Sequence, residues 1–248
     1  PPPLMSELAK NLSSTVGEVL RGKDEAIELA LITLFAGGHL LIEDSPGVGK
    51  TLLARSLARA LELPFQRIQC TADLLPADIV GGQIYNPRDG ELTFRPGPVF
   101  TSILLADELN RTPPRTQSAL LECMSERSIT VHRETHQLPD PFFVIATQNP
   151  MTSTGTYPLP ENQLDRFLLR IRIGYPDPEH EAAVVAQEDG HQLANEVSAI
   201  ASQAELLEAR AKVDDVRCDQ ELAALIVELA NRTRNTGSAL LGVSTRGA

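Results

Sequence analysis

Five short apolar segments recur in the first 174 residues, and helical or turn-rich stretches separate them. The segments are HLLIE (39–43), FQRIQC (65–70), SILLAD (102–107), FFVIAT (142–147) and FLLRIRI (167–173). Three of them are almost unbroken apolar runs, which is typical of parallel strands buried on both faces. Apolar residues at helical spacing predict helices over 50–61 and 114–125, and a short one near 161–166. This alternation predicts an α/β fold, with a five-stranded parallel sheet and helices on both of its faces.

Two more helices are predicted ahead of the first strand. Apolar residues recur every four positions from Leu4 to Leu20, and Gly22 is expected to end this helix. The second helix is predicted over residues 24–36, just before the Gly-Gly pair at 37–38.

Two segments depart from the alternation of strands and helices. Residues from about 71 to 98 contain several glycine, asparagine and proline turn signals between stretches of alternating polarity, which predicts a hairpin with its turn near 88–90. Residues from about 128 to 140, SITVHRETHQLPD, alternate in the same way and predict a second hairpin. Both hairpins are expected as insertions into the α/β core.

The pattern becomes helical after Tyr175, with helices expected at 178–188, 203–212 and 220–234. The composition changes at the same point, because residues 1–174 carry a net charge of −4 and residues 175–248 a net charge of −7. We therefore expect a sheet-containing core over 1–174 and a small all-α domain over 175–248.

Composition and charge exclude several classes of protein. The 248-residue chain has a net charge of −11, whereas a protein that binds nucleic acid over its whole surface is normally basic, so no nucleic-acid partner is expected. Cys70, Cys123 and Cys218 form no CxxC pair, which argues against a zinc site and favours a reducing compartment. No apolar run reaches 18 residues. We expect a cytoplasmic protein without direct membrane insertion.

The strongest chemical signal is EDSPGVGKT at residues 43–51, between an apolar strand and the helical stretch TLLARSLARALE. A glycine-rich turn at this place directs backbone N–H groups at phosphates. Lys50 is predicted to reach the β- and γ-phosphates of a nucleotide, and Thr51 to hold Mg²⁺. Asp44 stands where the strict Walker A pattern has glycine, and its carboxylate would repel phosphates unless it faces away or accepts a hydrogen bond. The predicted nucleotide-binding residues are Pro46, Gly47, Val48, Gly49, Lys50, Thr51, Leu52 and Asp107.

A second signal is ILLADE at residues 103–108, an apolar strand that ends in two carboxylates. This is the form of a Walker B motif. Asp107 is predicted to coordinate Mg²⁺, usually through water, and Glu108 to polarise the attacking water as general base. Such pairs are common at strand ends, and the preceding glycine-rich turn is what favours the catalytic interpretation.

Two later residues are candidates for contact with the γ-phosphate. Asn149 in ATQNP (146–150) is preferred over Gln148 because it lies further beyond the strand, although an asparagine before proline also forms turns. Arg166 in LDRFLLR is a candidate arginine finger, supplied by one subunit to its neighbour. The alternative for Arg166 is a surface ion pair with Asp165 or Glu161.

Arg246 is a third candidate, in the segment LGVSTRGA at 241–248. From the helical domain it could reach back to the phosphates, which would make that domain a lid. The alternative is an ordinary arginine that opens a helix.

The order of these signals resembles that of AAA+ ATPases of the MoxR family. The resemblance is carried by RGKDEAIELALITLFAGGHLLIEDSPGVGKT, DLLPADIVGG, FRPGPVF, LADELNRTPPRTQSALLECMSE, FFVIATQNP, LPENQLDRFLLRI and GVSTRGA, which together span residues 21–248. By this resemblance Asn149 is sensor 1, Arg166 is the arginine finger and Arg246 is sensor 2. The hairpin near 71–98 is similar to the family's insertion in the second core helix, and the hairpin near 128–140 to its pre-sensor 1 hairpin.

The resemblance also implies an activity and partners. It implies a P-loop NTPase (AAA+) core that hydrolyses ATP to ADP with Mg²⁺ held by Thr51 and Asp107, and with Glu108, Asn149, Arg166 and Arg246 as catalytic residues. It implies a homo-oligomeric ring, usually a hexamer, that acts as a chaperone-like motor on protein complexes, including partners with von Willebrand factor A domains. The family's lid normally continues past GVSTRGA, so the lid is expected to be truncated in this chain.

Two other functions stay open on the sequence. One is a DNA-acting AAA+ motor of a related clade, since related clades share both hairpins. The net charge weighs against it, although a central pore can be locally basic. The other is a nucleotide-gated scaffold with negligible turnover, against which the Asp107-Glu108 pair argues.

Overall fold

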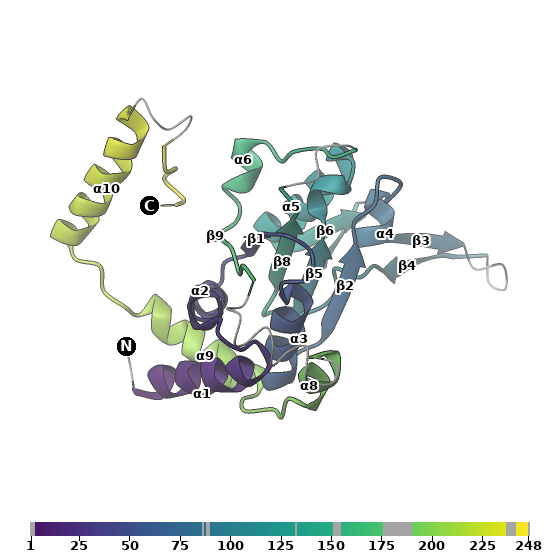
Figure 1. Ribbon diagram of the computed structural model, residues 1–248. Helices are drawn as coiled ribbons and strands as arrows, with labels where there is room; N and C mark the ends of the chain where they lie inside the picture. Colours follow the sequence, from purple (N-terminus) through teal and green to yellow (C-terminus); the bar gives the residue numbers. More distant parts are fainter. Residues whose placement is uncertain are drawn as a thin grey trace.

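The computed structural model describes residues 3–85, 87, 90–131, 133–150, 155–175, 190–236 and 242–247. Its centre is a sheet with strand order β2-β5-β8-β1-β9, in which every neighbouring pair is parallel (Figure 1). The strands are β1 (Leu40–Glu43), β2 (Phe65–Gln69), β5 (Ile103–Asp107), β8 (Phe143–Gln148) and β9 (Leu169–Ile171). The predicted five-stranded parallel α/β fold is confirmed.

Alternate residues of the central strands enter two different hydrophobic clusters. In β5, Ile103 and Leu105 belong to one cluster, and Leu104 and Ala106 to the other. The first cluster includes residues of α1 (Pro3–Val19), α2 (Asp24–Phe35) and α3 (Lys50–Ala60). The second includes residues of α4 (Pro76–Val80) and α5 (Pro114–Glu126). Because helices cover both faces, the three central strands β5, β8 and β1 can be apolar along almost their whole length, as the sequence indicated.

Local sequence signals set the ends of several of these elements. Pro114 occupies the first position of α5, where its missing N–H costs no hydrogen bond. At the other end of α5, Arg127 takes a left-handed conformation with φ of 51°. Gly37, with φ of +67°, follows the end of α2. The helices predicted over 4–20, 24–36, 50–61, 114–125, 203–212 and 220–234 agree with the structure to within two residues at each end, and α6 (Glu161–Leu164) ends two residues earlier than predicted. The helix α4 was not predicted, because residues 76–80 were expected to belong to the first hairpin.

Both predicted hairpins are present as antiparallel pairs. One joins β3 (Gly81–Tyr85) to β4 (Leu92–Pro96), and the other joins β6 (Ser128–Val131) to β7 (Glu134–Gln137). The first hairpin projects well beyond the sheet (Figure 1). The Phe94 ring of β4 stacks on the His136 ring of β7, with centroids 4.0 Å apart, so the two hairpins are in direct contact. Residues 88 and 89 of the predicted turn lie outside the described residues.

The C-terminal region consists of helices, as predicted. They are α8 (Gly190–Glu196), α9 (Gln203–Asp214) and α10 (Gln220–Asn235). The helix α8 was not predicted from the sequence, and the helix predicted over 178–188 lies outside the described residues. Leu206 and Ala209 of α9 join the first hydrophobic cluster, whereas α10 lies apart from the sheet in Figure 1 and buries only Ala230. The domain boundary after residue 174 stays a prediction.

Among the helices that can be described, none combines the length and the apolar character that crossing a membrane requires.

Candidate functional site

A pocket of about 370 Å³ lies where β1, β2 and β5 end. Its lining residues are Pro46, Gly47, Gly49, Lys50, Thr51, Leu52, Arg67, Gln69, Asp107 and Glu108. The fold therefore brings the predicted phosphate loop and the predicted Walker B carboxylates into one cavity. The carboxyl edge of a parallel sheet is the usual place for a ligand site in α/β proteins.

The glycine-rich turn needs its glycines for conformational and steric reasons. Gly47 and Gly49 have φ of +86° and +95°, in the left-handed region that favours glycine. A side chain at Gly49 would also meet Cδ1 of Leu20 at 2.5 Å. Val48 points the other way and is buried in the first hydrophobic cluster, so it anchors the loop and does not line the pocket.

Lys50 is the first residue of α3, and only 9% of it is exposed. Its Nζ donates a hydrogen bond to the backbone carbonyl of Asp44 at 2.7 Å. Burial lowers the pKa of Lys50, and the negative charges of Asp107, Asp44 and Glu108 act in the opposite direction. A partly desolvated ammonium group next to a glycine-rich turn is well suited to bind phosphate oxygens.

Asp107, at the end of β5, is held by residues on both neighbouring strands. Thr147 of β8 donates from Oγ1 to Asp107 Oδ1 at 2.6 Å. Arg67 of β2 donates from Nη2 to Asp107 Oδ2, also at 2.6 Å. Both carboxylate oxygens are thus fixed, and one of them faces a guanidinium group.

Glu108 has an unusual backbone conformation for its residue type. Its φ of 57° and ψ of 48° are left-handed, and its N–H donates to Thr147 Oγ1 at 2.8 Å. Its Oε2 accepts from Gln69 Nε2 at 3.2 Å and from Arg111 Nη1 at 2.9 Å. Non-glycine residues in this region are uncommon and concentrate at functional sites. The conformation turns Glu108 out of the strand direction and into the pocket that Lys50 lines.

The residues predicted to bind Mg²⁺ fit that role. Thr51 supplies a hydroxyl and Asp107 a carboxylate, and both line the same pocket as Lys50. Mg²⁺ usually binds one or two protein oxygens together with water and substrate phosphates. A magnesium ion that bound Asp107 directly would have to share this carboxylate with Arg67.

Asn149 follows β8 and does not line this pocket. It is buried, and its backbone carbonyl accepts a 3.4 Å hydrogen bond from Asn110 Nδ2. Gln148, the alternative, is the last residue of β8, and its buried Nε2 has no hydrogen-bond partner among the residues that the structure describes. The role predicted for Asn149 stays a prediction.

Arg166 and Arg246 also lie away from the phosphate loop. Arg166 donates from Nη1 to the Leu121 carbonyl at 2.7 Å and to Ser125 Oγ at 2.6 Å, both on α5. Arg166 and Arg246 line one pocket of about 280 Å³ that includes none of the phosphate-loop residues. Within one chain, the two arginines are therefore near each other and not near Lys50.

Sequence reasoning missed three residues of the site: Arg67, Gln69 and Thr147. Arg67 and Gln69 are two apart on β2, so they share a face of that strand. The pairing of β2 with β5 places Gln69 opposite Asp107. The segment FQRIQ shows no clear alternation, since Phe65 shares this face with the two polar residues. Which strand lies beside β2 could not be predicted from it either.

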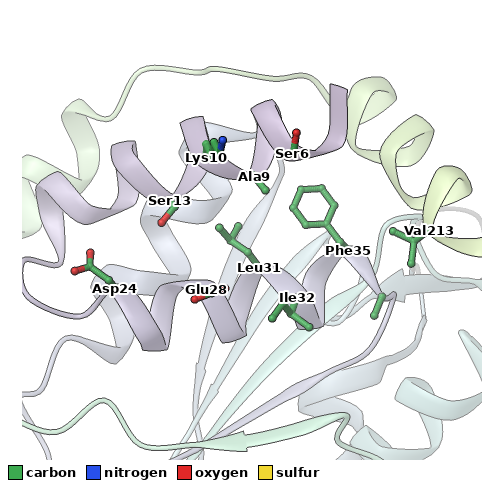
Figure 2. A pocket seen from close by; sticks show the side chains of 11 residues that line it. Ser6, Ala9, Lys10, Ser13, Asp24, Glu28, Leu31, Ile32, Phe35 and Val213 are labelled. Carbon is green, nitrogen blue, oxygen red and sulfur yellow. The ribbon is translucent and has the colours of Figure 1, made fainter. Parts of the chain in front are cut away.

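A second pocket, of about 460 Å³, lies between α1, α2 and α9 (Figure 2). Leu31, Ile32 and Phe35 of α2 line it, together with Ala9 of α1 and Val213 of α9. It is mainly apolar and contains none of the residues predicted to bind a nucleotide.

The chain matches a family profile and several known proteins. The sequence profile of the ATPase family associated with various cellular activities (AAA) matches residues 39–169. The chain is 49% identical over 234 residues to the uncharacterized protein YeaC of Bacillus subtilis, which covers 94% of this chain and 73% of YeaC. It is 47% identical over 170 residues to the chaperone MoxR1 of Mycobacterium tuberculosis, which covers 68% of this chain and 45% of MoxR1.

A solved structure and a further relative extend the comparison. A crystal structure of a candidate ATPase from Cytophaga hutchinsonii superposes with a TM-score of 0.86 at 40% identity, over 98% of this chain and 76% of that one. The protein MoxR of Methylorubrum extorquens is 33% identical over 175 residues. The chain spans about half the length of the two MoxR relatives, 45% of one and 50% of the other.

Proposed function

The chain belongs to the MoxR family of AAA+ ATPases, and on this premise we propose that it hydrolyses ATP to drive the remodelling or activation of partner proteins. The protein forms a ring-shaped homo-oligomer, which is a hexamer by resemblance to the family, and acts in the cytoplasm. ATP and Mg²⁺ are its cofactors.

One observation carries the proposal: Lys50, Thr51, Asp107 and Glu108 line a single pocket at the carboxyl edge of the sheet. The Lys50 ammonium group and the loop amides bind the phosphates. Thr51 and Asp107 would hold Mg²⁺, which would supply positive charge beside the phosphates. Glu108 orients and deprotonates the attacking water. Asn149, at the end of the neighbouring strand β8, acts as sensor 1.

The arginine finger is proposed to act between subunits. Arg166 lines a pocket that includes none of the phosphate-loop residues of its own chain. This separation supports contact with the nucleotide of a neighbouring subunit. A finger supplied in this way raises hydrolysis by about 10³- to 10⁵-fold, so an isolated subunit is expected to turn over slowly.

The two hairpins are proposed to transmit the motion to a protein partner. Ile84, Tyr85 and Leu92 are exposed at the outer end of the β3–β4 hairpin, where Tyr85 pairs with Leu92. The stacking of Phe94 on His136 links this hairpin to the second one. Exposed aromatic and aliphatic side chains on a projecting hairpin suit contact with a protein, such as one with a von Willebrand factor A domain, better than contact with nucleic acid.

The test of this function is the Glu108→Gln variant, measured for ATP binding and for steady-state phosphate release. We expect the affinity for ATP to stay within a fewfold of wild type. We expect the rate of phosphate release to fall by about 10²-fold or more, because glutamine has nearly the same shape as glutamate but cannot act as the base. Glu161→Gln is the matched control, since Glu161 is exposed on α6. Hydrolysis at the wild-type rate in Glu108→Gln would show that another group is the base.

A further inference from the structure

Asp44, the residue that replaces the first glycine of the strict phosphate-loop pattern, binds a distant part of the chain. Its Oδ2 accepts hydrogen bonds from the backbone N–H of Ile173 at 2.8 Å and of Gly174 at 2.5 Å. Its Oδ1 accepts from the N–H of Ser45 at 2.8 Å. Three N–H groups therefore donate hydrogen bonds to this carboxylate and stabilise its negative charge, which explains how the loop tolerates it.

The side chain continues the pairing of β1 with β9 beyond the two strands. The register pairs Leu40 with Leu169 and Ile42 with Ile171, so Asp44 stands level with Ile173. The acceptor for the N–H groups of Ile173 and Gly174 is the Asp44 carboxylate, whereas within the sheet the acceptors are backbone carbonyls. A glycine at position 44 would leave the N–H groups of Ile173 and Gly174 without this acceptor. Asp44 is not among the residues with positive φ, so its backbone needs no glycine.

The backbone groups of Asp44 connect it to the phosphate site. Its N–H donates to the carbonyl of Gln148, at the end of β8, at 3.0 Å. Its carbonyl accepts the 2.7 Å hydrogen bond from Lys50 Nζ. One residue thus connects the phosphate-binding lysine, the strand before Asn149 and the end of β9.

Ile173 and Gly174, which Asp44 binds, follow β9, where the chain leaves the sheet and continues towards its C-terminal helices. Gly174 is left-handed there, with φ of +69°, and Ile173 is buried. The next carbonyl, that of Tyr175, accepts a 2.6 Å hydrogen bond from Lys23 Nζ. Residues 173–175, which we name the exit segment, are therefore fixed by a carboxylate on one side and an ammonium group on the other.

We propose that Asp44 is a positioning residue that couples the phosphate loop to the exit segment. A nucleotide phosphate competes with the Asp44 carbonyl for the Lys50 ammonium group, and the resulting shift of the loop reaches Ile173 and Gly174 through the Asp44 carboxylate. The C-terminal helices that follow the exit segment then respond to the occupancy of the site. The response to nucleotide rests on the proposed function, whereas the attachment of the exit segment to Asp44 does not.

Hydrogen–deuterium exchange of the nucleotide-free protein tests the attachment. In Asp44→Gly, which restores the strict loop pattern, we expect the amides of residues 173 and 174 to exchange at least about tenfold faster, and those of β5 to stay unchanged. Asp44→Asn, which keeps one acceptor oxygen, is expected to give a smaller increase and serves if Asp44→Gly folds poorly. Glu43→Gln is the matched control, because Glu43 also contacts β9, through Arg170 at 3.3 Å. If the amides of residues 173 and 174 exchange at the wild-type rate in both Asp44 variants, the proposal is overturned.

The second arm adds ADP with Mg²⁺ and follows the same amides, with binding measured separately. We expect a change at 173 and 174 in wild type and in Glu43→Gln, and none in Asp44→Gly at saturating nucleotide. Wild-type protein that binds ADP without any change at these amides would overturn the coupling and leave the proposed function standing. Wild-type protein that binds no nucleotide would overturn the proposed function together with the coupling, while the exchange of the nucleotide-free protein still decides the attachment.

Discussion

Arg67 Nη2 and Asp107 Oδ2 are 2.6 Å apart, so a guanidinium group on β2 is hydrogen-bonded to the carboxylate that is proposed to bind Mg²⁺. The Arg67 side chain is 44% exposed, which limits the strength of this ion pair because water screens it. Gln69, on the same face of β2, reaches Glu108, so β2 contributes a partner to each Walker B carboxylate.

This contact predicts that Arg67 and Mg²⁺ compete for Asp107. In Arg67→Gln, we expect the Mg²⁺ concentration for half-maximal phosphate release to fall by about two- to fivefold, the range that an exposed ion pair supports. Titration of activity with MgCl₂ at fixed ATP measures this. Arg170→Gln, which removes an exposed arginine paired with Glu43, is the control. An unchanged or higher Mg²⁺ requirement in Arg67→Gln would contradict the competition.

Thr147 is predicted to position both Walker B carboxylates. Its buried hydroxyl accepts from the Glu108 N–H and donates to Asp107 Oδ1. Thr147→Val keeps the shape and loses both hydrogen bonds, so we expect the free energy of unfolding to fall by about 1–3 kcal/mol. We expect kcat to fall by about 10- to 100-fold, because a small displacement of catalytic groups is costly.

Thr101→Val is a matched control for this substitution. Thr101 is also buried, but its hydroxyl has no hydrogen-bond partner within the described part of the chain, so its loss is expected to be neutral or slightly stabilising. Chemical denaturation and steady-state kinetics of the two variants give the comparison. Equal effects of the two substitutions would mean that Thr147 acts by packing alone.

Arg166 is predicted to act on the nucleotide of a neighbouring subunit. Arg166→Ala is expected to lower kcat by about 10³-fold or more with little change in ATP affinity, since the residue lines no part of its own phosphate pocket. A mixture of Arg166→Ala with Lys50→Ala, each inactive alone, is expected to recover activity. In a randomly mixed ring, about one interface in four combines an intact Lys50 with an intact Arg166.

The same mixing experiment has a direct control. Arg172 is exposed beyond the end of β9, and Arg172→Ala is expected to retain full activity by itself. Absence of any recovery in the mixture of Arg166→Ala with Lys50→Ala, at concentrations where oligomers form, would argue that each site is complete within one chain.

His39 is predicted to make stability depend on pH. Its Nδ1 accepts from the Val144 N–H and its Nε2 lies 3.1 Å from the Met124 carbonyl, which together define a neutral ring with the proton on Nε2. Burial lowers the pKa of His39 from 6.5 to about 4. The unfolded chain therefore binds a proton between pH 6.5 and 4 that the folded chain rejects, so stability is lost as the pH falls through this range.

The free energy of unfolding is expected to fall by roughly 3 kcal/mol, which is the free energy that corresponds to this pKa shift of a buried ring. Urea unfolding at pH 7 and at pH 4.5 measures it. His39→Gln is expected to be less stable at pH 7 and to show a flatter pH dependence than the wild-type protein. A pH dependence in His39→Gln as steep as in wild type would assign the effect to other groups.

Much of the fold was predictable because its signals are local. The apolar runs of β1, β5 and β8 and the strand–glycine–helix sequence from Leu40 to Lys50 each depend on neighbouring residues only. Their order along the chain was enough to predict a parallel sheet with the phosphate loop at its carboxyl edge. The helix α8 was missed because its seven residues, GHQLANE, have too few apolar positions to show a period.

The sequence by itself determined the five strands of the sheet, most of the helices, the phosphate loop and the Walker B pair, since these follow from short-range spacing and from backbone preferences of glycine and proline. The tertiary structure decided what surrounds them. Arg67 meets Asp107 only because β2 packs beside β5, and Asp44 meets Ile173 only because β9 returns beside β1. It also decided that Arg166 and Arg246 lie together and away from Lys50. The physical reason is that burial of two apolar sheet faces sets which strands are neighbours, and no local pattern encodes a contact between residues 40 or 129 positions apart.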